Sequence, residues 1–325
     1  MHAFAFGGDQ EQEAVLAELR RLDSGPAILS FEEVVVLVKN LTGAERIAGL
    51  LSETRRAPQT RAFGFVLSAA LQAAQGRWRG AVTSLRGADA LDPAQFLVAM
   101  AFFSTQPLLP LSRDDVVGTR SRLLAGLPRA GFGDSLFGDR HSYLKPYLLG
   151  LLDARLEANS LSAYTAALER RLADSLAQRL GRELRAITVH ADGDAATALG
   201  HLRLRDLQEW GLPLPFRYAF SPSGYERFLR AEWLRELGRD DEALGWYAGL
   251  EQEDLQGLIY VAPGHLRQAE IYEQRGDLLK ARIQYERFLE WWGNADPELQ
   301  PLVRMASSRV ATLSISVPDK ENAPD

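Results

Sequence analysis

The chain has 325 residues, of which 46% are hydrophobic and 25% are charged, a balance that excludes wholesale disorder. Its formal net charge of −6 argues against a nucleic-acid-binding protein, because neutralising phosphates requires a basic surface. The absence of cysteine excludes disulfides, thiolate metal sites and a cysteine nucleophile.

The first predicted element is a helix over residues 9–21. It follows Gly8 as the second helix of a pair would, and residues 3–6 then correspond to the remnant of a first helix. This arrangement suggests that the chain begins inside a repeat and that an upstream part is missing. Residues 34–38 favour a β-strand by composition, but they lie between helical patterns and are assigned to a helix.

The middle of the chain is its least regular part. Residues 93–112 carry no charge over nearly membrane-spanning length, but two prolines and several polar residues interrupt them. We therefore predict a buried helix over residues 94–103, a proline-bounded loop after it, and no membrane insertion. Residues 127–138 predict a long loop, and long loops in compact arrays are often functional or mobile. The role of the segment 127–141 stays open.

A four-residue signature recurs four times along the chain. A small residue is followed by glycine seven positions later, by alanine after five more, and by a large apolar residue after a further four. The glycine is expected to end the first helix of a pair in a left-handed conformation, and the small residues let the paired helices approach closely. The matching positions are Ala69, Gly76, Ala81 and Leu85; Ala186, Gly193, Ala198 and Leu202; Ala231, Gly238, Ala243 and Tyr247; and Ala269, Gly276, Ala281 and Tyr285.

Two weaker copies extend the array. Gly43 and Ala48 keep the offset from glycine to alanine, and Ala158 and Ala163 form a poorer match with Leu151 at the small position. Copies about 34 residues apart are typical of stacked helix pairs.

The C-terminal part ends in a predicted capping helix over residues 297–313. Before it, apolar residues from Leu278 to Trp292 recur at steps of three and four, as on one face of an amphipathic helix. Asp296 then reads as the N-cap of the last helix, and Pro297 as its first residue.

Together these elements predict an all-α fold, a right-handed solenoid of antiparallel helix pairs with a C-terminal capping helix. The predicted divisions are N-terminal repeats over 1–92, an irregular helix and loop insertion over 93–147, C-terminal repeats with the capping helix over 148–313, and a disordered polar tail over 314–325.

The offsets of the signature resemble the tetratricopeptide repeat family. In addition, residues 228–313 are similar to the C-terminal repeat regions of large bacterial serine/threonine kinases and of transcriptional activators with a bacterial activator domain. The similarity lies in the stretches Arg230-Ala-Glu-Trp-Leu-Arg-Glu-Leu-Gly, Ala262-Pro-Gly-His-Leu-Arg-Gln-Ala-Glu-Ile-Tyr and Asp296-Pro-Glu-Leu-Gln-Pro-Leu-Val.

This resemblance implies a non-catalytic protein- or peptide-binding scaffold. The alternative that it implies is the sensor or docking region of a larger signalling kinase or transcriptional activator. The protein would then be cytoplasmic, or extracytoplasmic if it is the distal part of a membrane-anchored kinase.

No catalytic constellation is recognisable in the sequence. The glycine-rich loop, the lysine-bearing strand and the His-Arg-Asp and Asp-Phe-Gly motifs of a kinase are missing. His190 and His201 could meet across a helix hairpin as a zinc pair, although half-buried or surface histidines are the more ordinary outcome. A helical toroid enzyme, a third hypothesis, would need clustered carboxylates at a rim. We therefore expect no catalytic residue, no metal and no cofactor.

In a solenoid of this type the first helix of each pair lines the concave face. The helix period places five positions there: six and three before the first small residue, and one, four and five after it. In the two C-terminal units together, these positions carry four glutamates, one arginine and two aromatic residues. They lack the lysine and asparagine of the family's clamp for C-terminal carboxylates. These positions are Tyr225, Phe228, Glu232, Arg235 and Glu236 in the unit at Ala231, and Pro263, Leu266, Glu270, Glu273 and Gln274 in the unit at Ala269.

The charge of this face indicates a protein or peptide partner that is basic or apolar, and not a free-carboxylate tail. Alternatively, the glutamates simply keep an unused face in water. The sequence makes no prediction of oligomeric state.

Overall fold

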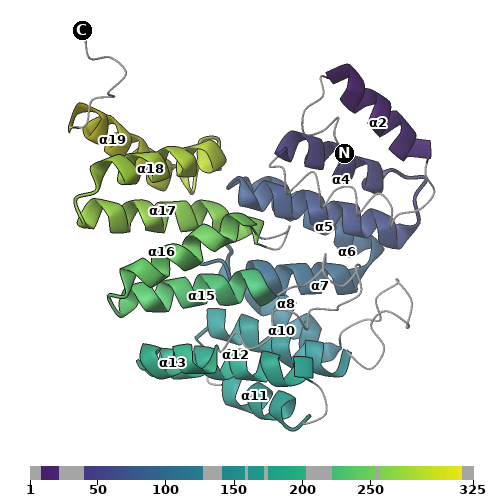
Figure 1. Ribbon diagram of the computed structural model, residues 1–325. Coiled ribbons are helices and arrows are strands. Elements are labelled where there is room, and N and C mark those ends of the chain that lie inside the picture. The colour runs from purple at the N-terminus through teal and green to yellow at the C-terminus, as the bar shows by residue number, and fades with distance from the viewer. Residues whose placement is uncertain are drawn as a thin grey trace.

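The computed structural model describes residues 9–21, 40–126, 141–157, 160–171, 175–202, 222–252 and 257–316. Every regular element in these ranges is helical, which confirms the all-α prediction (Figure 1). The predicted loop at 127–138 and the segment 34–38 lie outside the described residues. The elements are α2 (Asp9–Arg21), α4 (Leu41–Ser52), α5 (Pro58–Ala74), α6 (Trp78–Leu91), α7 (Pro93–Phe103), α8 (Arg113–Ala125), α10 (His141–Arg155), α11 (Leu161–Glu169), α12 (Ser175–Ala191), α13 (Ala195–His201), α15 (Pro222–Glu236), α16 (Asp240–Gly249), the 3-10 turn η3 (Leu250–Gln252), α17 (Leu258–Gln274), α18 (Leu278–Trp292) and α19 (Gln300–Ser316).

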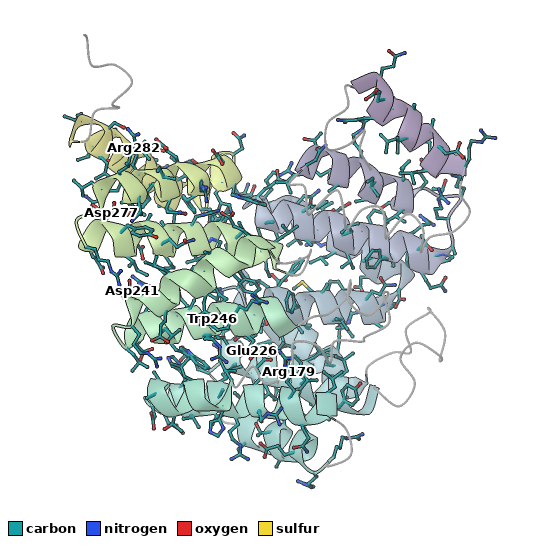
Figure 2. The ribbon with its side chains drawn as sticks, in the orientation of Figure 1. Arg179, Glu226, Asp241, Trp246, Asp277 and Arg282 are labelled. Atoms are coloured by element: carbon teal, nitrogen blue, oxygen red, sulfur yellow. The ribbon has the colours of Figure 1, made fainter. Side chains whose placement is uncertain are left out.

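Successive helices from α4 onward pack against one another in chain order, and six of them also form a closed circuit. We call these six the inner helices: α5, α7, α10, α12, α15 and α17. In this circuit α12 and α15 are joined by side chains such as Arg179 and Glu226, whose Nη2 and Oε2 atoms lie 2.6 Å apart (Figure 2). The circuit closes because α17 returns to pack against α5 (Figure 1). Helices that are distant in sequence therefore share one interior.

The four strong copies of the signature have the local structure that was predicted. All of their alanines are fully buried, and the large residue of each copy is at most 2% exposed. The four glycines have φ angles of 70°, 91°, 70° and 76°, the left-handed conformation expected at a helix end. At Gly76 the amide donates to the carbonyl of Ala73, and the next amide, of Arg77, donates to the carbonyl of Gln72 at 2.8 Å. This pair of bonds satisfies the last carbonyl groups of α5.

The weaker copies differ from the prediction. Gly43 lies in the first turn of α4, where its N–H is held by the N-cap side chain, so it does not end a helix. Ala163 is exposed. In α10 the close approach is made by Gly150 rather than Leu151, because a Cβ at Gly150 would lie 2.5 Å from Leu184 Cδ1. α10 also runs across the predicted division at residue 147.

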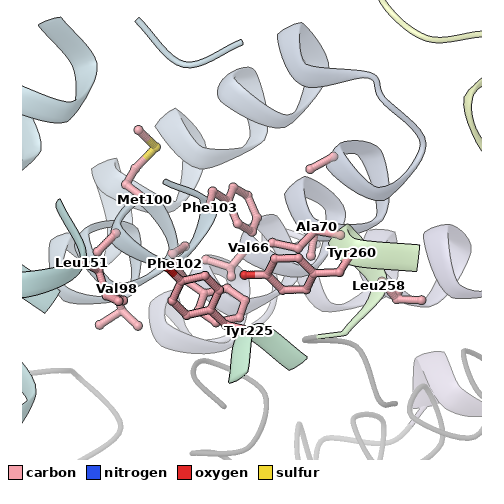
Figure 3. Packing of buried hydrophobic residues seen from close by; sticks show 14 of the residues in the cluster. Val66, Ala70, Val98, Met100, Phe102, Phe103, Leu151, Tyr225, Leu258 and Tyr260 are labelled. Carbon is pink, nitrogen blue, oxygen red and sulfur yellow. The ribbon is translucent and has the colours of Figure 1, made fainter. Parts of the chain in front are cut away.

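An aromatic cluster joins three inner helices (Figure 3). Tyr260 of α17 stacks on Phe228 of α15 with ring centroids 5.1 Å apart, and it meets Phe102 of α7 edge to face at 6.2 Å. Its hydroxyl group also bonds to Thr105, just after α7. The charge-free segment predicted as a buried helix is α7, and nearly all of its residues are buried.

An early and a late part of the chain meet at the turn between α5 and α6. Asp296, predicted to cap the final helix, instead accepts the N–H of Arg79 in the first turn of α6 at 2.6 Å. The N-cap residue of α6 makes no side-chain capping bond, so Asp296 supplies an acceptor from 217 residues away. Trp292 Nε1 donates to the carbonyl of Ala74 at 2.9 Å. The predicted start of the last helix is corrected accordingly, since α19 begins at Gln300.

Replacing Gly76 tests this closure against a matched backbone change. A Cβ at Gly76 would lie 2.6 Å from the Cβ of Ala295, whereas at Gly238 it would have no neighbour within 4 Å. Both alanine substitutions strain a left-handed residue by about 1–2 kcal/mol. We expect Gly76→Ala to lower the unfolding free energy by roughly 1–3 kcal/mol more than Gly238→Ala, because it also forces the closure apart. Urea denaturation measures the difference, and equal losses would contradict the closure.

The buried alanines of the second helices predict a cost of overpacking. Ala243 and Ala281 have no exposed surface, whereas Ala248, on the same helix as Ala243, is exposed. Ala243→Leu and Ala281→Leu should each lower the unfolding free energy by roughly 1–3 kcal/mol. Ala248→Leu is the control and should leave the denaturation midpoint nearly unchanged. Unchanged midpoints in both buried variants would show that these helices do not pack as described.

Candidate functional site

A cavity of about 690 Å³ lies where α10, α12 and α15 come together. Its walls come from the last turns of α10 and α12, from most of the length of α15, and from the loop after α7. The first residue of α16 and the last residue of α17 complete it. The inner helices thus build the cavity with residues that are far apart in sequence.

Six of the predicted face positions line this cavity, five from α15 and one from α17: Tyr225, Phe228, Glu232, Arg235, Glu236 and Gln274. The other four, all in α17, are not part of its lining: Pro263, Leu266, Glu270 and Glu273. The face predicted for one unit is therefore brought together at the cavity, and the face predicted for the next unit largely is not.

The lining follows one helical register in three successive inner helices. Counted from the small buried residue of each helix, positions one, four and five face the cavity. That residue is Gly150 in α10, Ala186 in α12 and Ala231 in α15. The lining positions are Leu151, Ala154 and Arg155; Ile187, His190 and Ala191; and Glu232, Arg235 and Glu236.

Sequence reasoning missed the α10 and α12 members of this lining. Applying the same offsets to Ala186 would have found those of α12, because that copy of the signature is intact. The α10 members had no such signal, since Gly150 stands one residue before the position assigned to the weak copy.

The predicted apolar anchors are less exposed than an open face requires. Tyr225 and Phe228 are 7% and 3% exposed, and Leu266 is 1% exposed. Tyr225 stacks on Tyr260 with ring centroids 6.1 Å apart, so it belongs to the aromatic cluster (Figure 3). Tyr225 and Phe228 form the floor of the cavity rather than protruding from it, and their part in binding stays a prediction.

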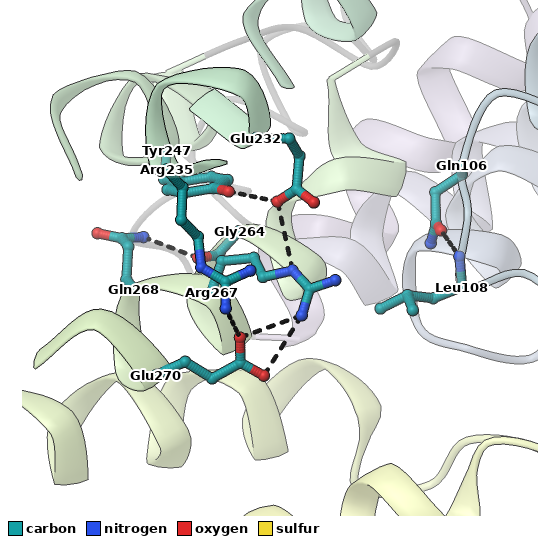
Figure 4. Close-up of polar contacts among 9 residues, drawn as sticks. All are labelled: Gln106, Leu108, Glu232, Arg235, Tyr247, Gly264, Arg267, Gln268 and Glu270. Atoms are coloured by element: carbon teal, nitrogen blue, oxygen red, sulfur yellow. Dashed lines mark hydrogen bonds and ion pairs between the residues drawn. The ribbon is translucent and has the colours of Figure 1, made fainter. Parts of the chain in front are cut away.

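Arginines lie beside most of the glutamates that the sequence placed on this face, and Figure 4 shows this for Glu232 and Glu270. Three of the four glutamates lie within 3.4 Å of an arginine nitrogen. The excess of negative charge expected from the sequence is therefore largely cancelled. Some of the arginines that cancel it lie outside the predicted face positions. The pairs are Glu232 with Arg267 at 3.3 Å, Glu270 with Arg235 at 2.9 Å and with Arg267 at 3.1 Å, and Glu273 with Arg309 at 3.4 Å.

Glu236 is the exception among these glutamates. Its Oε2 lies 2.7 Å from His190 Nε2, and no lysine or arginine within the described ranges pairs with it. The ring of His190 stacks on Trp233, with centroids 4.8 Å apart and an angle of 17° between the planes. His190 thus contacts a carboxylate and an indole. Across the residues that the structure describes, no group of three or more His, Cys, Asp or Glu side chains could hold a metal ion.

A buried carboxyl group, Glu183, also lies on α12. It is 1% exposed, and the Tyr147 hydroxyl group donates to its Oε1 at 2.5 Å. Burial, and then the nearby charge of Glu226, raise the pKa of Glu183 from its ordinary 4.5 to about 8, while Tyr147 and Arg179 act in the opposite direction. The carboxyl group is therefore mostly protonated at neutral pH.

No protein-family model matches the chain, and a comparison with curated proteins finds no match. Among the described helices, none is long and apolar enough to cross a membrane.

The raised pKa of Glu183 predicts a stability that falls as pH rises. The unfolded chain loses this proton near pH 4.5, whereas the folded protein keeps it up to about pH 8. Between these values the folded state binds one more proton, so the stabilisation present below pH 4.5 is lost as pH rises through 8. Glu183→Gln keeps an acceptor for Tyr147 and should flatten this slope. Urea denaturation of both proteins at pH 6 and pH 9 measures it, and parallel slopes would contradict the prediction.

Proposed function

We propose that this protein is a non-catalytic scaffold that binds a protein or peptide, and that its helix pairs form a right-handed solenoid of tetratricopeptide type. The observation that carries the proposal is the shared register of the cavity. Equivalent positions of α10, α12 and α15 line it, so three units contribute to a surface that no single helix could build. A concave, mostly preformed site of this kind is typical of ligand binding.

The length of the cavity favours an extended peptide. Tyr225 and Glu236 both line it and lie eleven residues apart on α15, so it runs about 16 Å along that helix. An extended peptide of about five residues covers this distance.

The resemblance of residues 228–313 to the repeat regions of bacterial kinases and activators supports a narrower form of the proposal. In that form the scaffold is a sensor or docking region that works with a catalytic or DNA-binding domain. The coding sequence upstream would distinguish the general proposal from this narrower form, because the narrower form requires a catalytic or DNA-binding domain there.

The closed circuit of inner helices favours a helical toroid enzyme as a second candidate. Such an enzyme would need two carboxyl groups that act on one substrate. In the described lining of this cavity Glu232 lies beside Arg267 and the Tyr247 hydroxyl group, and Asp240 lies beside Arg275, so Glu236 has no second carboxyl group free to act with it. These contacts favour the scaffold.

Filling the cavity tests the proposal. Ala191 is exposed at the cavity wall, and Ala196, on the next helix, is also exposed but outside the lining. Peptides selected from a phage-displayed random library against the wild-type protein should bind Ala191→Trp at least about tenfold more weakly, a loss of about 1.4 kcal/mol. They should bind Ala196→Trp as tightly as the wild type. Fluorescence anisotropy measures these affinities, and equal binding to all three proteins would show that the cavity is not the site.

A further inference from the structure

We propose that the Glu236 end of the cavity binds an arginine side chain of the partner peptide, with Glu236 as its counter-ion. This inference rests on the proposed peptide-binding function and adds the residue that the peptide must carry.

The first support is the charge balance of the cavity. Its other acids each lie near an arginine, Glu232 near Arg267 at 3.3 Å and Asp240 near Arg275 at 3.5 Å. Glu236 has the ring of His190 beside it, and its side chain is 52% exposed. In the part of the chain that the structure describes, its charge is therefore not matched by a lysine or arginine, and it is open to a ligand.

The second support is that the two arginines lining the cavity are held elsewhere. Arg235 directs its Nη2 to Glu270 at 2.9 Å. Arg155 donates to the carbonyl groups of Pro107 and Leu109 at 3.4 Å and 3.3 Å. A cationic ligand therefore meets its attractive charge at Glu236 and is kept from the Arg155 side by repulsion.

The third support is the planar surface next to Glu236. His190 is fixed by its stack on Trp233 and by its contact with Glu236, and a third of its side chain remains exposed. A guanidinium group is planar and delocalised, so it can stack on an imidazole ring while it bonds to the adjacent carboxylate. A lysine ammonium group can make only the second of these contacts. This arrangement selects arginine.

The fourth support is the surface available to the methylene stem. Ile187 of α12 and Leu229 of α15 line the same cavity and are half-buried. The three methylene groups of an arginine can lie along such apolar surface while the charged head reaches the rim.

Two peptides that differ only in charge test the proposal. The probes are fluorescein-labelled Ala-Leu-Arg-Leu-Ala amide and its twin with citrulline, an uncharged group of the same shape, in place of arginine. The variants are Glu236→Gln and, as a matched control, Glu242→Gln on α16. Glu242 is 56% exposed and outside the cavity lining.

Fluorescence anisotropy should give an affinity about tenfold higher for the arginine peptide on the wild type and on Glu242→Gln. On Glu236→Gln the two peptides should differ by less than about twofold. Equal affinities on the wild type, or a preference that survives Glu236→Gln, would overturn the arginine site. If the library-selected peptides still bind Ala191→Trp more weakly than the wild type in that case, the scaffold function stands without the arginine site. If no peptide from either source binds, the proposed function itself is wrong.

Discussion

The structure depends on a helix cap that is supplied across the chain. α6 has no capping side chain of its own, and Asp296 provides the acceptor from 217 residues away. The loss of such a cap costs about 1 kcal/mol, and Trp292 adds a second hydrogen bond at the same contact. Arrays of helix pairs are usually held together by nearest neighbours alone. Here the early and late pairs also stabilise each other.

The aromatic cluster holds three of the inner helices together beside the cavity. Tyr260 connects α17 to α7 and α15, so these inner helices cannot separate without disrupting the aromatic cluster. The ion pairs of Glu232 and Glu270 add to this contact, because they link α15 to α17. Charges that are already paired contribute little to recognition of a ligand, since a ligand would have to displace their partners. In the arginine site proposed above, Glu236 is therefore the carboxylate that recognises the ligand.

The sequence predicts the strong repeats well because their requirements are local. A left-handed helix end demands glycine, and a close helix crossing demands a small residue, so both can be read in one segment. The contact of Asp296 with Arg79 leaves no such local sign, since Asp-Pro-Glu satisfies the pattern for a cap of its own helix equally well. The pairing of Glu273 with Arg309 is missed for the same reason. The cavity was only partly predictable. The signature gives the positions of α15 that line it, whereas in α10 the close approach is made by Gly150 and not by Leu151, the position that the weak copy assigned.

Because α6 and its capping residue are far apart along the chain, the cap is synthesised well after the helix. At 5–20 residues per second, roughly 10–40 s pass between the emergence of Arg79 and that of Asp296. During that interval α6 has no cap, and the surface around Gly76 that later receives Ala295 faces water. The contact around α6 is thus completed only after the later helix pairs have been made, and the growing chain exposes this surface while the residues between Arg79 and Asp296 are synthesised.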